Sequence, residues 1–571
     1  MRPLDYLVLV ASMLGIAAYG VWRSRNRATL EGYVSGQKDV GWGTIGLSVM
    51  ATQASAVTFL STPGQGFESG MGFVQNYFGL PFALIIVAAI FLPLYRSSGV
   101  FTAYEYLGKR FDGKTRLLGA SLFLLQRGFA SGITIYAPAI VLSTVMGWDL
   151  DLTILGTGIL TIIYTAVGGN DAVNITQKYQ MAVIFIGMVT AFVILFLKLP
   201  AEVSAGDAFA LAAGFDKLNA VVYSTDINQR YTIWSGIFGG IFLSLSYFGT
   251  DQSQVQRYLS GTSVRESRLG LMFNAVMKIP MQFFILLLGV MLFVFYQFAP
   301  APVFFDHSTW ERHVNAEGGA YLRTYEAAYA EKMDAKRAAI RSWLDARSRN
   351  DAAATERKLN DIRTAHAAAQ NVRGEAKAAL VQRDPAVKTK DSDYVFITFI
   401  LEQLPVGLVG LLIAVIFAAA LSSLSAEMSA LGTTTSIDIY HHVINPKSSD
   451  QQSLLVSKIA TAGWGVVGIL FALFANVVEN LVEAINILGS LFYGTILGLF
   501  LVAFFLRGVR GNAVFWGAVI AQAGVLICYA NLSIGYLWYN LIGCGGCVLL
   551  SVIIQSFIRP SKPTRFAPTT S

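Results

Sequence analysis

The stretch Pro405-Val-Gly-Leu-Val-Gly-Leu-Leu-Ile-Ala-Val-Ile-Phe-Ala-Ala-Ala-Leu-Ser-Ser-Leu-Ser425 is an apolar run that carries two adjacent hydroxyls, Ser422 and Ser423. In a helix, Ala419, both serines and Ala426 recur at i, i+3, i+4 and i+7, so they share one face. Small residues on that face let another backbone approach closely. Two hydroxyls there, meeting free carbonyls of a broken helix, would form an all-oxygen nest for a hard monovalent cation. Packing of serines between helices is the alternative that this span leaves open.

The composition excludes a soluble globular protein. The chain has 571 residues, of which 54% are hydrophobic and 13% are charged, and its mean hydropathy is +0.54. Such values predict an all-α polytopic membrane protein. The pI near 9.1 does not indicate nucleic-acid binding, because Lys and Arg lie mostly in loops, where membrane topology explains them. Cys544 and Cys547 have CxxC spacing but lie in a Gly-rich apolar run, which favours packing over redox or metal chemistry.

Thirteen apolar stretches are each long enough to cross a bilayer, which takes about 20 residues in a helix. They lie near residues 4–23, 42–61, 72–96, 116–146, 150–168, 178–199, 231–256, 269–298, 405–434, 453–475, 480–506, 512–530 and 535–557. Loops without Lys or Arg alternate with basic loops, and basic loops stay in the cytoplasm. We therefore expect an integral protein of the plasma (inner) membrane, with its N-terminus outside and its C-terminus cytoplasmic. An odd number of spans requires the same orientation.

Residues 300–393 interrupt this pattern, because they are polar and rich in Ala, Glu, Lys and Arg. The parity of the spans places them outside, and their composition favours helix. Asn350-Asp351 offers a turn followed by an N-cap, so we expect a helical hairpin of about 320–349 and 351–383. Its apolar content is too low to predict a binding pocket. The hairpin is then a solvated appendage or the docking site of a partner protein that remains unknown.

Two spans become polar halfway along their length. The second reads Leu47-Ser-Val-Met-Ala-Thr-Gln-Ala-Ser-Ala-Val-Thr-Phe-Leu-Ser-Thr-Pro-Gly-Gln-Gly66, and the seventh reads Leu243-Ser-Leu-Ser-Tyr-Phe-Gly-Thr-Asp-Gln-Ser-Gln-Val-Gln-Arg257, in which Gly249 could break the helix. So many hydrogen-bonding groups are poorly suited to face lipid. Interrupted helices at corresponding positions, five spans apart, are typical of inverted-repeat transporters with the site between them. Two polar helices that line a water cavity without transport are the alternative.

Several motifs resemble the sodium/solute symporter family, whose members carry sugars, proline, sialic acid, iodide, monocarboxylates and vitamins. The resemblance covers roughly residues 30–300 and 395–510. It is carried by Gly168-Gly169, Tyr247-Phe-Gly-Thr-Asp-Gln252 with Gln256-Arg257, Ala419-Ala-Leu-Ser-Ser423 and Ser436-Ile-Asp-Ile-Tyr440. Ser55-Ala-Val-Thr-Phe-Leu-Ser-Thr-Pro63 and Ile135-Tyr-Ala-Pro-Ala139 look most like the iodide/monocarboxylate/multivitamin branch. The resemblance implies a LeuT-type fold with a 5+5 inverted repeat.

This fold, combined with the predicted spans, divides the chain into six parts. We expect an extra N-terminal helix and cytoplasmic loop in 1–41, a first repeat in 42–199, an extracytoplasmic loop in 200–230, a second repeat in 231–299 and 394–506, the extracytoplasmic hairpin insertion in 300–393, and two extra helices with a cytoplasmic tail in 507–571.

The resemblance also implies a sodium site. Its ligands would be the carbonyls of Ala51, Ala54 and Ala419 and the hydroxyls of Ser422 and Ser423. Neutral oxygens hold sodium weakly enough to release it. The family's Trp-Thr-Asp is replaced here by Ile175-Thr-Gln177, and Ala426 stands where some relatives have Ser, which argues against a conventional second sodium site. Glu427, one turn towards the cytoplasm from Ser423, is a possible ion exit or a partner for a Lys or Arg.

The expected substrate site combines the two polar spans with residues that the family places around its solute. Our candidates are Gln53, Thr58, Tyr77, Arg127, Ser244, Tyr247, Phe248, Lys278 and Asn486. Arg127 has no acidic residue near it in its own helix, and an intramembrane Arg needs a partner. A carboxylate would fit its bidentate fork, which favours a small organic anion such as a monocarboxylate. An acidic partner from another helix is the alternative.

The functional expectation is a sodium-coupled secondary symporter that imports a small solute by alternating access. Its partners would be the solute, the sodium ion and the lipid bilayer, and no nucleic acid. No Walker motif or nucleophile constellation supports an enzyme. The alternatives are a proton-coupled transporter of the same fold and a membrane sensor or receptor whose hairpin binds a partner.

Overall fold

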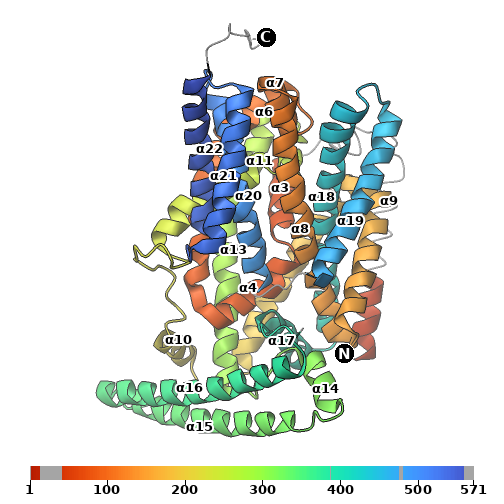
Figure 1. Ribbon diagram of the computed structural model, residues 1–571. Coiled ribbons are helices and arrows are strands. Elements are labelled where there is room, and N and C mark those ends of the chain that lie inside the picture. Colours follow the sequence, from red (N-terminus) through yellow and green to blue (C-terminus); the bar gives the residue numbers. More distant parts are fainter. Residues whose placement is uncertain (1, 13–40, 386, 475–479, 559–571) are drawn as a thin grey trace.

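The molecule is an upright bundle of helices with a long helical pair lying across one end (Figure 1). This computed structural model describes residues 2–12, 41–385, 387–474 and 480–558, and the side chains of 164 and 166–180 lie outside the description. The basic loop that follows the first predicted span and the basic C-terminal tail, at 23–38 and 559–565, also lie outside it. The described secondary structure is helical throughout, which agrees with the predicted all-α class.

The first half of the chain contains both short and long helices. They are α3 (Trp42–Gln53), α4 (Ala56–Ser69), η1 (Gly70–Tyr77), α5 (Leu80–Ile86), η2 (Val87–Phe91), α6 (Leu92–Ser98), α7 (Ala103–Arg110), α8 (Gly113–Met146), α9 (Leu150–Leu197), α10 (Ala205–Gly214), η3 (Ser235–Gly239), α11 (Gly240–Thr250), α12 (Gln252–Leu259) and α13 (Val264–Phe298). The second half begins with the polar insertion and ends with five long apolar helices. Its elements are α14 (His307–Asn315), α15 (Leu322–Ser348), α16 (Ala352–Arg383), η4 (Ser392–Tyr394), α17 (Val395–Gln403), α18 (Leu408–Thr434), η5 (Thr435–Ile444), α19 (Asp450–Phe474), α20 (Leu481–Phe505), α21 (Gly511–Asn531) and α22 (Leu537–Phe557).

Within the described residues, 8 helical stretches are long and apolar enough to cross a membrane. Each coincides with one predicted span, from 72–96 and 116–146 to 535–557. The five other predicted spans are interrupted, fall within α9, or extend beyond the described residues. The start of α9 lies beside the polar insertion, because Asp149 pairs with Arg312 at 3.1 Å. Its end packs through Phe196 on Phe209 of α10, a helix that is itself paired with the insertion. That placement suits two antiparallel spans, and the full count of thirteen stays a prediction.

Both interruptions expected from the sequence are present as breaks in helices. The helical run from Trp42 stops at Gln53 and resumes at Ala56, and Ala54 has a non-helical φ of −90° and ψ of 63°. The second break falls at Asp251, with φ −76° and ψ 120°, and not at Gly249 as the sequence suggested. Gly249 stays inside α11, where a Cβ would lie 2.8 Å from the Phe91 ring. Close packing, and not backbone freedom, therefore explains this glycine.

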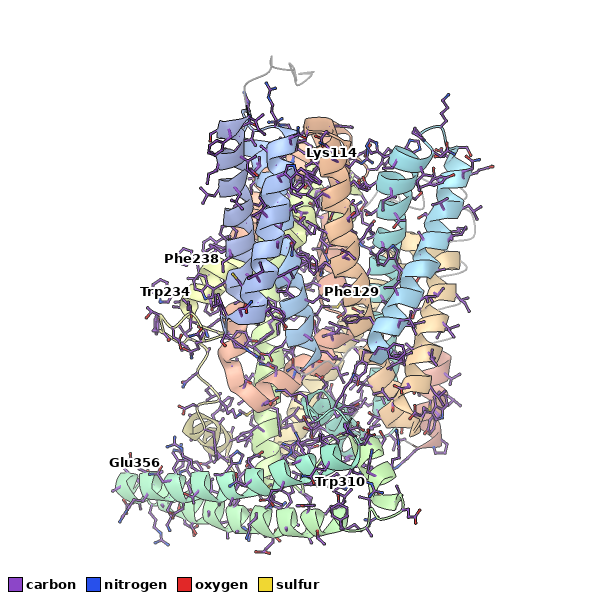
Figure 2. The ribbon with its side chains drawn as sticks, viewed as in Figure 1. Lys114, Phe129, Trp234, Phe238, Trp310 and Glu356 are labelled. Atoms are coloured by element: carbon purple, nitrogen blue, oxygen red, sulfur yellow. The ribbon has the colours of Figure 1, made fainter. Side chains whose placement is uncertain are left out.

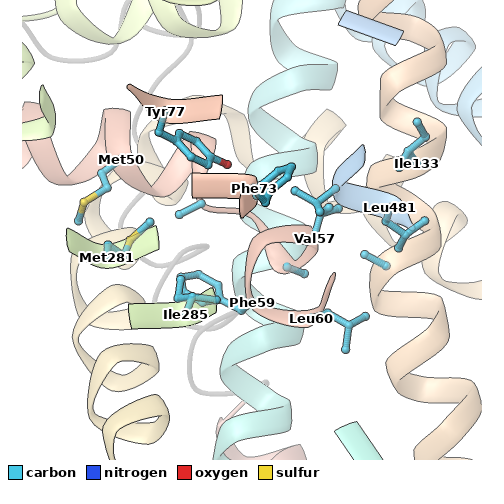
Figure 3. Packing of buried hydrophobic residues seen from close by; sticks show 14 of the residues in the cluster. Met50, Val57, Phe59, Leu60, Phe73, Tyr77, Ile133, Met281, Ile285 and Leu481 are labelled. Atoms are coloured by element: carbon cyan, nitrogen blue, oxygen red, sulfur yellow. The ribbon is translucent and has the colours of Figure 1, made fainter. Parts of the chain in front are cut away.

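Buried apolar side chains hold the first break in place. Figure 3 shows Met50 and Phe59, one on each side of the break, near Met281 and Ile285 of α13. All four side chains are at most 4% exposed. The break is therefore packed against a continuous helix, which keeps its freed carbonyls at a fixed place in the bundle.

Glycines bring α4 into backbone contact with two neighbours. A Cβ on Gly66 would lie 2.3 Å from the Leu286 carbonyl oxygen of α13, and a Cβ on Gly289 would lie 2.0 Å from the Pro63 carbonyl oxygen. On another side of α4, a Cβ on Gly64 would lie 2.1 Å from the Ser392 carbonyl oxygen of η4. Any side chain at these positions would force the helices apart, so α4, α13 and η4 form one closely packed unit.

Residues 300–393 form α14 and the long antiparallel pair α15 and α16 (Figure 1). Ile340, Trp343 and Ile362 are buried within or beneath this pair. An Arg347–Asp207 ion pair of 2.7 Å fastens α15 to α10. The helix of residues 3–12 begins at this end of the bundle, whereas α22 ends at the opposite end. Which end faces the cytoplasm stays a prediction.

Candidate functional site

A central cavity of about 90 Å³ lies beside both helix breaks. Since a water molecule needs roughly 10–15 Å³ measured in this way, the cavity has room for a small polar solute. Its walls combine polar groups with aromatic rings from α3, α4, η1, α8, α11, α18 and α20. They comprise Thr52, Gln53, Ser55, Val57, Thr58, Asn76, Tyr77, Gln126, Arg127, Leu243, Ser244, Tyr247, Phe248, Glu427, Val482, Ile485, Asn486 and Tyr493.

Most predicted substrate residues meet at this cavity. Gln53, Thr58, Tyr77, Arg127, Ser244, Tyr247, Phe248 and Asn486 line it, although they come from six elements spread over the chain. Gln53 Oε1 is buried and has no hydrogen-bond partner, so a solute could use it. Their role in binding stays a prediction.

Lys278 is the predicted residue that does not line the cavity. It is 0% exposed, and its Nζ lies 5.8 Å from the centroid of the Tyr77 ring. Tyr77 therefore stands between the ammonium group and the cavity. Lys278 Nζ has no hydrogen-bond partner among the described residues, and a buried cation without one is costly. A solute group or water reaching past Tyr77 would satisfy it.

The predicted sodium positions converge at the first break. The Ser423 hydroxyl donates to the Ala51 carbonyl at 3.3 Å, which joins α18 to the last turn of α3. Ser422 Oγ is buried and has no hydrogen-bond partner in the part of the chain that the structure describes. Ala54 and Ala419 are also buried. The last carbonyls of a helix have no intrahelical partner, so this oxygen-rich place fits a monovalent cation. Sodium binding there stays a prediction.

Arg127 is neutralised by two carboxylates from other helices. Its guanidinium pairs with Asp251 at the break between α11 and α12, and with Glu427 of α18 at 3.2 Å. Tyr493 completes the network, because its hydroxyl accepts from Arg127 at 2.6 Å and donates to Asp251 at 2.9 Å. We had inferred a bound anion from the lack of acidic residues in the helix of Arg127. The structure supplies the alternative, an acidic partner from elsewhere.

Glu427 has an arginine as its partner, which is one of the two roles expected for it. It lines the central cavity and pairs with Arg127 of α8. A role on the path of the ion stays a prediction. Of the two departures from the family's second sodium site, Ala426 is fully buried, and the side chain of Gln177 lies outside the described residues.

The sequence interpretation missed Asp251, Tyr493, Gln126 and Asn76. Asp251 stood within the quoted Tyr247–Gln252 motif, and an acidic residue at a helix break in an apolar span is a signal that could have found it. Tyr493 had no such signal, because an aromatic residue in an apolar helix is ordinary. Asn76 and Gln126 are single polar residues whose burial depends on distant helices.

A second polar network ties the helices together between the cavity and the polar insertion. Glu483 of α20 accepts from Gln65 Nε2 of α4 at 3.1 Å and from the Tyr231 hydroxyl, and it pairs with Arg230 at 3.3 Å. Asn480 donates to the Gln65 side-chain oxygen. These bonds hold α4 and the start of α20 together, so the cavity is covered on this side.

Comparisons with known proteins agree with this geometry. The chain is 31% identical to the human sodium/iodide cotransporter and 30% identical to the human sodium-coupled monocarboxylate transporter 2, over 51% and 47% of its length. These matches span 45% and 44% of the two carriers, so less than half of each. The sodium/sialic acid symporter SiaT of Proteus mirabilis (strain HI4320) is 24% identical over 98% of this chain and 96% of the symporter.

A solved structure has the same fold over nearly the whole chain. The substrate-bound, outward-open state of a Na+-coupled sialic acid symporter superposes with a TM-score of 0.74 at 24% identity, covering 98% of this chain and 99% of that one. The model of the sodium:solute symporter family matches residues 33–316 and 373–521. The unmatched residues between these ranges include most of α15 and α16. On this match, the chain belongs to the sodium:solute symporter family.

Proposed function

We propose that this chain is a sodium-coupled secondary active symporter that imports a small solute by alternating access. The observation that carries the proposal is the contact between the Ser423 hydroxyl and the Ala51 carbonyl at a broken helix, next to a cavity with polar walls. An ion held there would touch both halves of the broken helix and α18. Sodium and solute would then favour the same arrangement of helices, which is what coupling requires.

In this proposal the carbonyls of Ala51, Ala54 and Ala419 and the hydroxyls of Ser422 and Ser423 bind the sodium ion. Ser422 offers a buried oxygen that no protein donor uses. The side chains of Gln53, Thr58 and Ser244 orient the solute, while Tyr247 and Phe248 cover it. We keep the topology expected from the loops, with the hairpin outside and α22 ending in the cytoplasm, as part of the proposal.

The solute is small, because the cavity is, and we propose a monocarboxylate ahead of a neutral compound. Lys278, and no longer Arg127, supports this choice. Arg127 already faces Asp251 and Glu427, and their combined charge would repel another carboxylate. Lys278 has no hydrogen-bond partner for its Nζ in the described structure, and that atom lies 5.8 Å from the centroid of the Tyr77 ring, which lines the cavity.

Uptake of radiolabelled solutes into vesicles that contain the purified protein tests the coupling. An inward sodium gradient should accumulate the solute, whereas a proton gradient without sodium should not. Accumulation driven by protons alone would favour the proton-coupled alternative. No accumulation of any solute in a broad panel, with the protein correctly inserted, would favour the sensor or receptor alternative.

Lys278→Met tests the proposed monocarboxylate. The variant keeps the length of the side chain and removes its charge, so uptake of a carboxylate should fall by about tenfold or more. Gln282→Met is the control, because Gln282 is buried one turn after Lys278 on α13, does not line the cavity and carries no charge. Equal uptake of an anionic solute by the wild type and Lys278→Met would exclude Lys278 as its recognition group.

A further inference from the structure

A second cavity, of about 320 Å³, lies where the α15–α16 hairpin meets the bundle. Its walls come from the end of α4, the loop after α10, α13, α15, α16 and the segment before η4. The charged and titratable groups on it are Glu68, Lys217, Lys336, His366, Arg373, Lys377, Lys390 and Asp391. This corrects our expectation that the hairpin lacks a binding pocket, since a cavity lined by charged groups needs little apolar content.

The two carboxylates of this hairpin cavity form ion pairs with three of its five cationic side chains. Asp391 pairs with Arg373 and Lys377, each at 2.6 Å. Glu68 pairs with Lys390 at 2.8 Å. A carboxylate that already binds one or two cations attracts a further one only weakly. The positive charge of the remaining two lysines is thus not balanced within the cavity.

Those remaining lysines bond only to neutral groups in the described structure. Lys217 Nζ donates to the backbone carbonyls of Phe67 at 3.1 Å and Glu68 at 2.5 Å. Lys336, which is 1% exposed, has His366 Nδ1 at 3.4 Å. Burial lowers the pKa of Lys336 to about 7 and that of Lys217 to about 8. Neither lysine forms an ion pair in the described structure, and Glu68, the carboxylate that acts on Lys217, is already paired with Lys390.

His366 adds a further donor to the cavity. Burial and the nearby Lys336 and Lys217 lower its pKa to about 3, so the ring is neutral. When Lys336 is protonated, its ammonium group donates to His366 Nδ1 at 3.4 Å, which places the ring proton on Nε2. The cavity then offers ammonium and imidazole N–H donors to an anion, beside one amide oxygen, Gln297 Oε1, that is unpaired among the described residues.

We propose that the hairpin cavity binds a small oxyanion, such as inorganic phosphate or a carboxylate, between Lys217, Lys336 and His366. The cavity has room for such an ion together with water, and the oxygens of one oxyanion can accept from several N–H donors at once. Lys336 and His366 both fall within residues 317–372, which the family model does not match, whereas Lys217 lies within the matched residues. The proposed site therefore joins the insertion to the rest of the chain, and it does not rest on the proposed transport.

The position of the site suggests what a bound anion would do. Phe67 and Glu68, on its wall, form the last turns of α4, the second half of the broken helix. Lys217 already bonds to their carbonyls, and Lys390 bonds to the Glu68 side chain. An anion shared by Lys217 and Lys336 would fasten α15 to the end of α4.

Binding is tested on the full chain, purified in detergent without sodium. Phosphate, acetate and chloride, as choline salts at equal ionic strength, are titrated by calorimetry and by the melting temperature. Phosphate or acetate should give a saturable rise that chloride does not. Which of the two binds more tightly distinguishes a phosphate site from a carboxylate site. A response that chloride reproduces would overturn the proposal, because it would be a general effect of salt.

Lys336→Met should weaken oxyanion binding by about tenfold or more. Lys332→Met is the matched control, because Lys332 lies one turn earlier on α15 and pairs with Glu331 outside the cavity. If Lys336→Met does not fold, Lys217→Met is measured in its place. Wild-type affinity in the folded variant would show that the anion binds elsewhere and would reject the site.

Discussion

The central cavity and the hairpin cavity are both buried and charged, but their charges are arranged in opposite ways. In the central cavity, Arg127 faces two carboxylates, Asp251 and Glu427. In the hairpin cavity, five cationic side chains face two carboxylates, Glu68 and Asp391. In the central cavity the cation has its counter-ions within the protein, whereas two lysines of the hairpin cavity form no ion pair in the described structure.

This difference separates structural charges from those that await a ligand. A buried ion pair costs desolvation, and it is strongly destabilised when one partner is removed. A buried cation without a partner costs stability by its presence. Removing a cation should therefore have opposite effects on stability in the two cavities, and this contrast can be measured.

The largest effect is expected from Arg127→Gln, which leaves Asp251 and Glu427 buried without a counter-ion. We expect a loss of about 3–5 kcal/mol in stability and little transport of any solute. The melting temperature in detergent and uptake into vesicles measure the two consequences. Arg127→Lys keeps the charge but loses the bidentate geometry of the guanidinium group. Its melting temperature and uptake should lie between those of the wild type and Arg127→Gln. A normal melting temperature for Arg127→Gln would show that the network is not structural.

An intermediate effect is expected from Ser423→Ala, which removes a proposed ligand without changing any charge. The sodium concentration for half-maximal uptake should rise by about tenfold or more, if the ligand contributes about 1.4 kcal/mol. The melting temperature without sodium should hardly change, unlike that of Arg127→Gln. Ser425→Ala is the control, since Ser425 lies on the same helix and bonds to Thr165 at 2.8 Å. Equal sodium dependence in both variants would reject the proposed site.

The smallest effect is expected from Lys336→Met, and its sign is reversed. Because burial lowers the folded-state pKa of Lys336 from 10.5 to about 7, the unfolded chain binds more protons between these values. Stability should therefore increase from about pH 7 to pH 9 in the wild type, in the absence of oxyanions. Lys336→Met should melt at a higher temperature at pH 7 and depend less on pH. A lower melting temperature at pH 7 would mean that Lys336 has an acidic partner.

The sequence predicted the fold class and most of the central cavity, because local patterns carry that information. Polar residues inside apolar spans marked Gln53, Thr58 and Ser244, and the small-residue face marked Ser422 and Ser423. Each signal needs only the residue and its neighbours within one helix. The resemblance to a family then related these positions across the chain.

What the sequence did not show depends on contacts between distant residues. Arg127 and Glu427 are 300 positions apart, and nothing in either helix indicates that they meet. Gly249, which the sequence offered as the break, packs against Phe91, and that contact is not visible in the sequence. The hairpin cavity forms only where α4, α13, α15 and α16 meet. The polar composition of residues 300–393 is typical of a solvated surface, so it did not indicate a cavity.

The glycine contacts of α4 also have a consequence for watching the protein at work. Since Gly64 holds η4 against α4, a tilt of α4 should be transmitted to the hairpin. Helix α16 has 32 residues and is about 48 Å long, so a tilt of about 5° would displace its far end by roughly 4 Å. Glu356 lies at that tip and is exposed (Figure 2). A fluorophore at Glu356 would thus give an optical record of single turnovers, far from the central cavity.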